Sequence, residues 1–333
     1  MATIKDVAKE ARVSTATVSR VLNGNYPVSQ DAKEKVENAI KALNYHPNAV
    51  ARSLKQNKTY LIGVLVPDIA NPYFMDLARG IESVVSVEGY NLVFGSTDED
   101  ASKEMNLLRV LNEKRVDAVV VATRQEKPDK INELINQGLN ILMVDTYIKD
   151  IKCDYVVEDD YDAAYRLVKH LIEHGHTQIA IVNGLLSVST SQQRLRAYKD
   201  ALEEYGIPIN DKFLLQGDYN RECSYQSMKQ LLKEEVLPTA IFSTNNIMTE
   251  SVMLAAKEAG LSIPEDLSLV SFGNITLPGL IEPQLTYIKQ NSFEMGKRAG
   301  NLILDKLDHT FFESKEHIIH LDMQAGDSVK DMH

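Results

Sequence analysis

The stretch TIKDVAKEARVSTATVSRVLNG, Thr3–Gly24, predicts two short helices joined by a tight turn. Apolar residues recur at positions i, i+3 and i+4 in each half, at Ile4, Val7 and Ala8 and again at Val18, Val21 and Leu22. Thr3 and Ser14 are good N-cap residues, and Gly24 is a good helix end. Four residues, ARVS, connect the halves, and so short a connection is typical of a helix-turn-helix.

A third helix is predicted in SQDAKEKVENAIKALNY, residues 29–45, with Ser29 as N-cap and Pro47 beyond its end. Residues 1–46 are therefore expected to form a helical head. Residues 1–58 hold ten Lys and Arg and five Asp and Glu, a charge of +5, which leaves −16 for the rest of a chain of net charge −11. A basic head on an acidic body indicates that the head meets a polyanion, the alternative being a merely solvated helical bundle.

The outer face of the second predicted helix carries short polar side chains and one arginine. Arginine can donate two hydrogen bonds to guanine, alanine can pack on a thymine methyl, and hydroxyl and amide groups can bond base edges or phosphates. We therefore expect this face to contact DNA through Thr15, Ala16, Thr17, Ser19, Arg20 and Asn23.

From Tyr60 onward, short apolar runs alternate with amphipathic stretches. This pattern is typical of parallel, doubly wound sheets covered by helices. Helices are predicted at residues 74–88, 103–113, 162–173, 192–205, 222–235 and 249–259. Strands are predicted at residues 60–67, 90–96, 117–122, 140–145, 178–184, 213–219, 239–244, 267–273, 285–290 and 316–322. Ten strands would make a large single sheet, so we expect an α/β core of two doubly wound parallel-sheet lobes behind an all-α helix-turn-helix head.

Three stretches carry a family resemblance: Thr3–Gly24, NYHPNAVARSLK at 44–55 and IGVLVPDIANPYF at 62–74. They resemble the LacI/GalR family of bacterial transcription repressors, and the similarity runs along nearly the whole chain. The resemblance implies that Thr15, Ala16 and Arg20 select bases in the major groove. It also implies a core (59–333) like the type I periplasmic sugar-binding proteins. The first lobe is then expected at about 59–158 plus 288–315, and the second at about 159–287 plus 316–333.

The segment NAVARSLK, residues 48–55, reads as a helix but is too short to be stable alone in water. In a dimer of this family, we expect residues 47–58 to form a hinge helix that folds on the minor groove. Leu54 would wedge between base pairs, Ala51 would allow close approach, and Lys55 would offset phosphate charge. The alternative is a frayed linker whose Leu54 packs on the body.

Polar side chains follow several predicted strands at the end where ligands bind in such sheets. Carboxylate, guanidinium and amide groups beside aromatic rings suit hydroxyl-rich ligands. The predicted effector site consists of Tyr73, Phe74, Asp145, Arg194, Tyr219, Asn245 and Gln290. By resemblance, the family's effector contacts fall on Asp145, Arg194, Asn245 and Gln290. The family usually has Asp where this chain has Gly273, and often Arg where it has Thr146, which leaves the identity of the ligand open.

The sequence gives no support for a catalytic function, because it contains none of the usual nucleotide-binding, zinc-protease or nucleophile-elbow motifs. We expect no enzyme activity and no cofactor. The segment HLIEHGH, residues 170–176, is interpreted as the C-terminal end of a helix, where histidine is favourable for the helix dipole, rather than as a metal site. Cys153 and Cys223 are expected to be reduced thiols. Without a signal peptide or membrane span, we expect the protein in the cytoplasm and away from membranes.

We therefore expect a homodimeric, sequence-specific repressor of a carbohydrate-utilisation operon that binds a pseudopalindromic operator. Its expected partners are double-stranded operator DNA, a second copy of itself and a small-molecule effector, a sugar or sugar derivative. One alternative is a cytosolic carbohydrate-binding protein. Another is a carbon-catabolite regulator whose corepressor is a protein rather than a sugar.

Overall fold

The structure is a computed structural model that describes residues 2–23, 27–45, 58–275, 278–308 and 315–333. The chain divides into two compact units, Met1–Thr59 and Tyr60–His333. None of the helices within the described ranges is long and apolar enough to cross a membrane.

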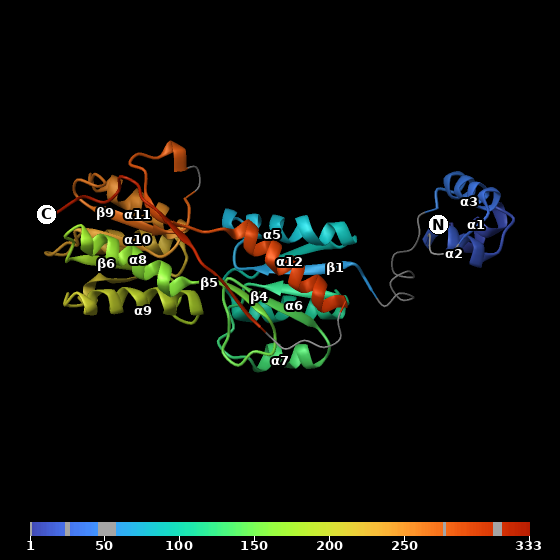
Figure 1. Ribbon diagram of the computed structural model, residues 1–333, viewed down its shortest axis with the longest axis horizontal. Coiled ribbons are helices and arrows are strands. Elements are labelled where there is room, and N and C mark those ends of the chain that lie inside the picture. The colour runs from blue at the N-terminus through green and yellow to red at the C-terminus, as the bar shows by residue number, and fades with distance from the viewer. Residues whose placement is uncertain (1, 24–26, 46–57, 276–277, 309–314) are drawn as a thin grey trace. The chain divides into compact units, whose positions relative to one another are not determined.

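The first unit contains three helices, α1 (Ile4–Glu10), α2 (Thr15–Asn23) and α3 (Gln30–Ala42) (Figure 1). Helix α1 begins with a capping box, in which Thr3 accepts from the Asp6 backbone and Asp6 accepts from the Thr3 backbone. Ser29 caps α3 by accepting from the backbone of Ala32. Small and branched residues fill the core between the helices: Val7, Ala8, Ala11, Val18, Val36 and Ala39. The predicted helix-turn-helix head is confirmed.

The second unit contains two six-stranded sheets with matching strand orders, β11-β5-β4-β3-β1-β2 and β12-β10-β9-β8-β6-β7. The first sheet is parallel throughout and consists of β1 (Leu61–Val66), β2 (Asn91–Ser96), β3 (Ala118–Val121), β4 (Asn140–Val144), β5 (Tyr155–Glu158) and β11 (Glu316–Ile319). The second consists of β6 (Ile179–Asn183), β7 (Leu214–Gln216), β8 (Ala240–Ser243), β9 (Ser268–Phe272), β10 (Thr286–Lys289) and β12 (Asp322–Gln324). Its only antiparallel pair, among the pairs described, is β10 with β12.

Helices cover both faces of each sheet. In the first lobe these are α5 (Pro72–Val85), α6 (Ala101–Glu113), α7 (Asp129–Asn136) and α12 (Ser292–Asp308). In the second lobe these are α8 (Asp160–Glu173), α9 (Ser189–Glu204), α10 (Arg221–Leu231) and α11 (Asn246–Glu258). Short 3-10 turns are η1 (Ser86–Glu88), η2 (Asp211–Phe213) and η3 (Pro278–Leu280). Each sheet has one apolar cluster on each face, so the predicted pair of doubly wound lobes is confirmed.

The chain crosses between the two lobes three times, after β5, after β10 and after β11 (Figure 1). The second lobe is therefore built almost entirely from one continuous insertion into the first. The return segment contributes only α12 and β11 to the first lobe before β12 closes the second sheet.

The predicted lobe boundaries were wrong at two of these crossings. Residues 316–322 were expected to be one strand in the second lobe, but β11 pairs with β5 in the first sheet and only β12 lies in the second. Only His320 separates Ile319 from the apolar Leu321, so the hydrophobic pattern does not mark where the chain leaves the first sheet. The expected switch at 287/288 falls inside β10, which belongs wholly to the second sheet. Strand β5 was not predicted, because its only aliphatic residues, Val156 and Val157, stand among acidic residues on both sides.

Candidate DNA-reading helix and ligand cleft

Helix α2 of the head presents short side chains to solvent. Ser14 immediately precedes the helix, and its hydroxyl accepts from the backbone N–H of Thr17 at 3.1 Å. Thr15, Ala16 and Arg20 are exposed, whereas Val18 is fully buried against the other two helices. The three residues expected to select bases are therefore all accessible on one helix.

The remaining predicted DNA contacts are less exposed or are not described. Thr17 and Ser19 are half-buried, and the hydroxyl of Thr17 shares a 2.9 Å hydrogen bond with Ser14. The side chain of Asn23 lies outside the described residues, as do Ala51, Leu54 and Lys55 of the hinge. All nine of the expected DNA contacts stay predictions.

All seven residues predicted to bind an effector line one cavity between the lobes. They reach it because the strands of both sheets end there: Asp145 follows β4, Asn245 follows β8 and Gln290 follows β10. Tyr73 and Phe74 come from the first turn of α5, which Asn71 caps by accepting from the Tyr73 backbone. The cavity volume is about 40 Å³. That is room for about three water molecules, so a larger ligand needs the lobes or their side chains to move apart.

Seven further residues line the same cavity: Asp68, Asn71, Glu99, Arg124, Thr190, Asn246 and Ile247. Several follow strand ends just as Asp145 does. Asp68 comes after β1, and Arg124 comes after β3. Applying the strand-end rule to every predicted strand would have found Asp68 and Arg124, whereas nothing in the local sequence marks Glu99 as the partner of Arg124.

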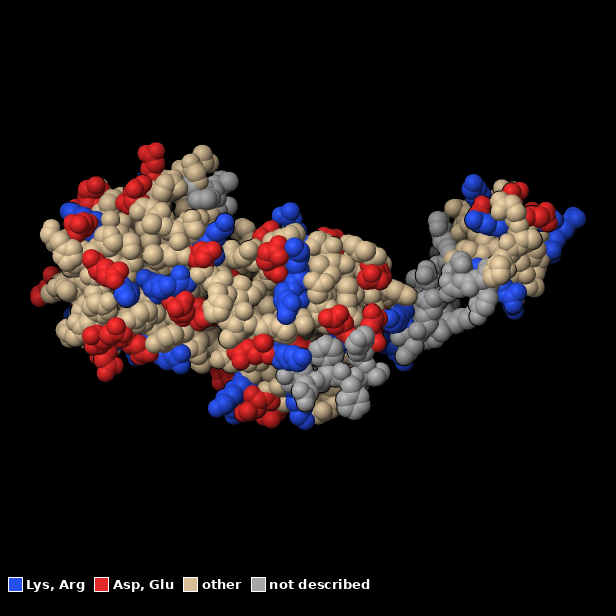
Figure 2. Space-filling model, viewed as in Figure 1, with Lys and Arg blue, Asp and Glu red and all other residues tan. Residues whose placement is uncertain are grey.

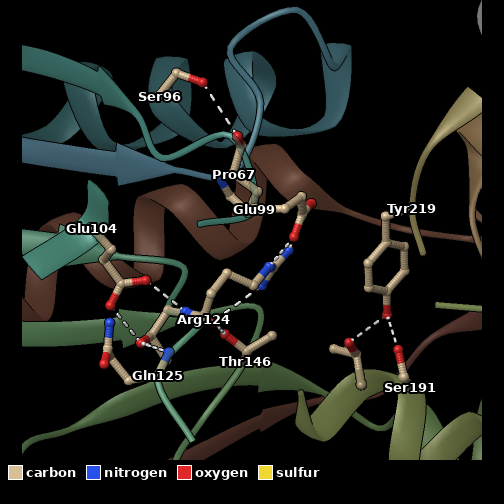
Figure 3. Close-up of polar contacts among 11 residues, drawn as sticks. Pro67, Ser96, Glu99, Glu104, Arg124, Gln125, Thr146, Ser191 and Tyr219 are labelled. Atoms are coloured by element: carbon tan, nitrogen blue, oxygen red, sulfur yellow. Dashed lines mark hydrogen bonds and ion pairs between the residues drawn. The ribbon is translucent and has the colours of Figure 1, made fainter. Parts of the chain in front are cut away.

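In the first lobe, Arg124 lies at the centre of a polar network (Figure 3). Its guanidinium group forms an ion pair with Glu99, with Nη2 to Oε1 at 3.3 Å, and it lies 5.7 Å from the ring centre of Tyr219. Buried Glu104 on α6 binds the residues that follow β3. It accepts from the Arg124 backbone at 2.6 Å and from the Thr123 hydroxyl at 2.8 Å. Tyr219 faces Arg124 from the second lobe, and its hydroxyl shares hydrogen bonds with Thr190 and Ser191 at 2.8 and 2.7 Å.

In the second lobe, Arg194 has a partner carboxylate that is itself buried. Its Nε and Nη2 both bond Oδ1 of Asp160, at 2.8 and 2.6 Å, and its Nη1 donates to the carbonyl of Thr244 at 2.5 Å. The guanidinium carbon lies 3.6 Å from the ring centre of Phe272. With these contacts, the Arg194 side chain is 4% exposed.

Buried carboxyl groups outnumber the arginines around the cavity. Burial raises the pKa of Asp145, against the opposing effect of Arg124 and Arg194. Burial also raises the pKa of Asp160 to about 6, although the ion pair with Arg194 opposes this. Burial and the neighbouring Asp160 raise the pKa of Glu158, which ends β5, to about 8. Glu158 is therefore mostly protonated at neutral pH.

Direct hydrogen bonds join the lobes at the cavity. Asn246 donates to the side-chain oxygen of Asn71 at 3.0 Å, and Asn71 donates back at 3.4 Å. The backbone N–H of Tyr147 donates to the hydroxyl of Ser189 at 3.0 Å. These hydrogen bonds must break if the lobes move apart. They therefore contribute to the free-energy difference between this arrangement of the lobes and one in which they are separated.

Both units match models of known protein families. Residues 3–48 match "Bacterial regulatory proteins, lacI family", and residues 59–325 match "Periplasmic binding proteins and sugar binding domain of LacI family". The repressor PurR of Haemophilus influenzae is 38% identical over 309 residues, which cover 93% of this chain and 92% of that protein. Catabolite control protein A of Priestia megaterium is 36% identical over 302 residues, which cover 90% and 91%.

Among solved structures, the Lac repressor dimer bound to operator and the anti-inducer ONPF matches with a TM-score of 0.87 and 26% identity, over 99% of each chain. The matched family consists of transcriptional regulators rather than enzymes, in agreement with the expectation from the sequence. The chain belongs to the LacI family of bacterial regulatory proteins.

Proposed function

We propose that this LacI-family repressor acts in the cytoplasm as a homodimer that binds a pseudopalindromic operator. In this proposal, α2 of each copy enters the major groove, and residues 47–58 fold in the minor groove. The exposed row Thr15, Ala16 and Arg20 on α2 is the observation that carries it. The charge distribution supports this proposal. Residues 1–58 carry a net charge of +5, whereas acidic and basic side chains are interspersed on the face of the second unit drawn in Figure 2.

We further propose that a small molecule in the cavity controls DNA binding. The cavity lining contains two arginines, and each already has a carboxylate partner. Asp68 and Asp145 add further carboxyl groups to the lining. A phosphate or carboxylate ligand would be repelled by this surplus, whereas hydroxyl groups can donate to it. The lining thus favours an uncharged, donor-rich ligand such as a neutral sugar.

A second candidate effector is a protein corepressor, as in a carbon-catabolite regulator. The similarity to catabolite control protein A over nine-tenths of both chains favours this alternative. In that case the cavity would modulate the response or remain empty, and the neutral-sugar proposal would fail while the DNA-binding proposal stood.

DNA binding is tested with fragments selected from a random pool by the full-length protein. We expect two copies per fragment and an affinity whose logarithm falls linearly with the logarithm of salt concentration. Arg20→Ala should weaken binding to the selected site by about 10- to 100-fold while sparing binding to unrelated DNA. Lys33→Ala, an exposed cation on α3, is the matched control. Failure to enrich any sequence, even at low salt, would overturn the proposal.

The ligand proposal is tested by thermal shift and calorimetry with D-ribose, D-glucose, cellobiose, guanine and glucose 6-phosphate. We expect at least one neutral sugar to stabilise the protein in proportion to its occupancy and to change operator affinity. Stabilisation by glucose 6-phosphate, with no effect of the neutral sugars, would contradict the electrostatic argument.

A further inference from the structure

The three segments that cross between the lobes are joined to one another at the end of β5. The first crossing follows Glu158, the last residue of β5, and the second begins after β10 at Gln290. Nε2 of Gln290 donates to Oε2 of Glu158 at 2.5 Å. The backbone N–H of Asp159 donates to the carbonyl of Ile319, the last residue of β11, at 2.9 Å. Residues 158–159 therefore contact both of the other crossings.

Polar contacts also hold the third crossing to the start of α8. Asp159 caps this helix, because its Oδ1 accepts from the Asp162 backbone at 3.2 Å. Its Oδ2 lies 3.3 Å from Nδ1 of His320, which follows β11. Arg166 of α8 donates to the carbonyl of Leu321 at 2.5 Å. A rotation of one lobe against the other must act on these contacts, so the crossings form the hinge of the core.

Glu158 is a buried carboxyl group within this hinge. Its residue is 5% exposed, and its second oxygen, Oε1, has no hydrogen-bond partner among the described residues. A charged carboxylate with an unpaired oxygen inside protein costs more free energy than the neutral acid does. The structure around Glu158 therefore favours the protonated form.

Neighbouring charges act in the same direction. In the described part of the chain, the charged or titratable groups that face Glu158 are Asp160 on α8, Asp145 after β4, Arg194 on α9 and Tyr73 on α5. Arg194 opposes the two acids, but it is already paired with Asp160. Burial and the charge of Asp160 raise the pKa of Glu158 from its ordinary value of 4.5 to about 8.

The hydrogen bond of Glu158 links protonation to the arrangement of the lobes. Glu158 ends a strand of the first sheet, and Gln290 follows a strand of the second. A movement that separates the two side chains lets water reach the carboxyl group and lowers its pKa toward 4.5. The contribution of neutral Glu158 to the present arrangement is then complete below pH 4.5 and is lost as pH rises toward 8.

We propose that Glu158 makes the hinge of the core pH-sensitive: its neutral form stabilises the present arrangement of the lobes, and its ionisation favours their separation. This inference goes beyond the proposed function, because it concerns the core and requires neither DNA nor a ligand. One consequence is that any molecule that binds one arrangement better than the other takes up or releases protons as it binds.

The protonation state is tested by infrared spectroscopy of the full-length protein between pH 5 and pH 9. Glu158→Gln keeps an acceptor for Gln290 but cannot ionise. The difference between the wild-type and Glu158→Gln spectra should contain the C=O stretching band of a protonated carboxyl group at pH 6, and this band should be gone by pH 9. Absence of the band at pH 6 would show that Glu158 is already charged and would overturn the proposal.

The distance between the lobes is measured by pulsed electron paramagnetic resonance in the full-length protein. Spin labels are attached at Asn106→Cys on α6 and Gln192→Cys on α9, two exposed positions near the strand ends at the cleft. Cys223→Ser removes a partly exposed thiol, and Cys153, 1% exposed, stays unlabelled. An excess of unlabelled protein restricts the signal to pairs within one chain. The ratio of separated to closed cores should rise by up to about 50-fold from pH 6 to pH 8 and level off above pH 9.

Three variants show whether this response comes from Glu158. Glu158→Gln should lose the rise between pH 6 and pH 8. Asp154→Asn should keep it, because Asp154 is equally buried with one unpartnered oxygen but precedes β5, at the other end of the strand. His320→Gln should also keep it, since it removes a titratable partner of Asp159 and leaves Glu158 in place. The same pH dependence in the wild type and Glu158→Gln, or its loss in either control, would overturn the proposal.

Discussion

The two lobes have the same strand order and each brings a buried arginine to the cleft, but they hold the two arginines differently. Arg194 of the second lobe is paired with Asp160, and both side chains are at most 6% exposed. Arg124 of the first lobe is equally buried, yet its partner Glu99 is 25% exposed. A carboxylate that reaches solvent can leave an ion pair at little cost, whereas one enclosed by protein cannot. The comparison indicates that Arg194 maintains the fold of its lobe, and that the pair of Arg124 with Glu99 can shift to admit the hydroxyl groups of a ligand.

The largest effect is expected from Arg194→Met. The substitution leaves Asp160 buried without its partner, and the loss of free energy of unfolding should be about 3–5 kcal/mol. Urea unfolding followed by circular dichroism measures it. The double variant Arg194→Met/Asp160→Asn should recover part of the loss, because the uncompensated charge is gone. A loss under about 1 kcal/mol would remove the distinction between the two arginines.

Gly273→Asp should follow, with a loss of about 2–4 kcal/mol from the left-handed backbone and from the overlap with Gln290. Removing the overlapping side chain in Gly273→Asp/Gln290→Ala should recover about 1–2 kcal/mol, since only the backbone strain remains. Thermal unfolding of the four proteins forms a double-mutant cycle. Strict additivity would show that the two side chains do not compete for one space.

Glu158→Gln should alter the pH dependence of stability. The folded-state pKa of Glu158, about 8, is higher than its ordinary value, so its contribution is fully present below pH 4.5 and is lost as pH rises toward 8. Glutamine carries no such cost. The stability of Glu158→Gln relative to the wild type should therefore rise by about 2 kcal/mol between pH 6 and pH 8. Parallel stability curves for the two proteins would contradict this expectation.

The smallest effect on stability is expected from Arg124→Met, about 1 kcal/mol, because Glu99 can turn to water. The same substitution should abolish most binding of any sugar that binds the wild type. Together with Arg194→Met it forms a matched pair, measured by the same urea titration and the same calorimetry. Equal destabilisation by both substitutions would show that the exposure of Glu99 does not matter.

The sequence predicted the fold class and many of the cleft residues because both depend on local patterns. Asp145, Asn245 and Gln290 each end an apolar strand, and in a parallel sheet those ends meet at one edge. Contacts between residues that are far apart in the sequence produce no such local pattern. Glu99 reaches Arg124 across 25 positions and Glu158 reaches Gln290 across 132, and no periodicity links either pair. Glu158 was missed for a second reason, because β5 has only two aliphatic residues, Val156 and Val157, and therefore no apolar run that marks a strand.

The crossing after β11 was also not predicted, because it too depends on contacts between distant segments. Apolar residues occur on both sides of it, at Ile318, Ile319, Leu321 and Met323, and only the partners of each strand, β5 for β11 and β10 for β12, separate the two strands. Strand pairing is a property of the whole sheet, so it could not be inferred from residues 316–322 alone.

The triple crossing between the lobes bears on how the protein withstands proteases. Cutting the backbone at any one crossing leaves two covalent links, so a single nick does not release either lobe. A nicked core should keep its apparent mass under native conditions and fall into fragments only when denatured. Damage at one link would then leave a molecule that still holds its cleft together, and all three connections would have to be cut to remove every covalent link between the lobes.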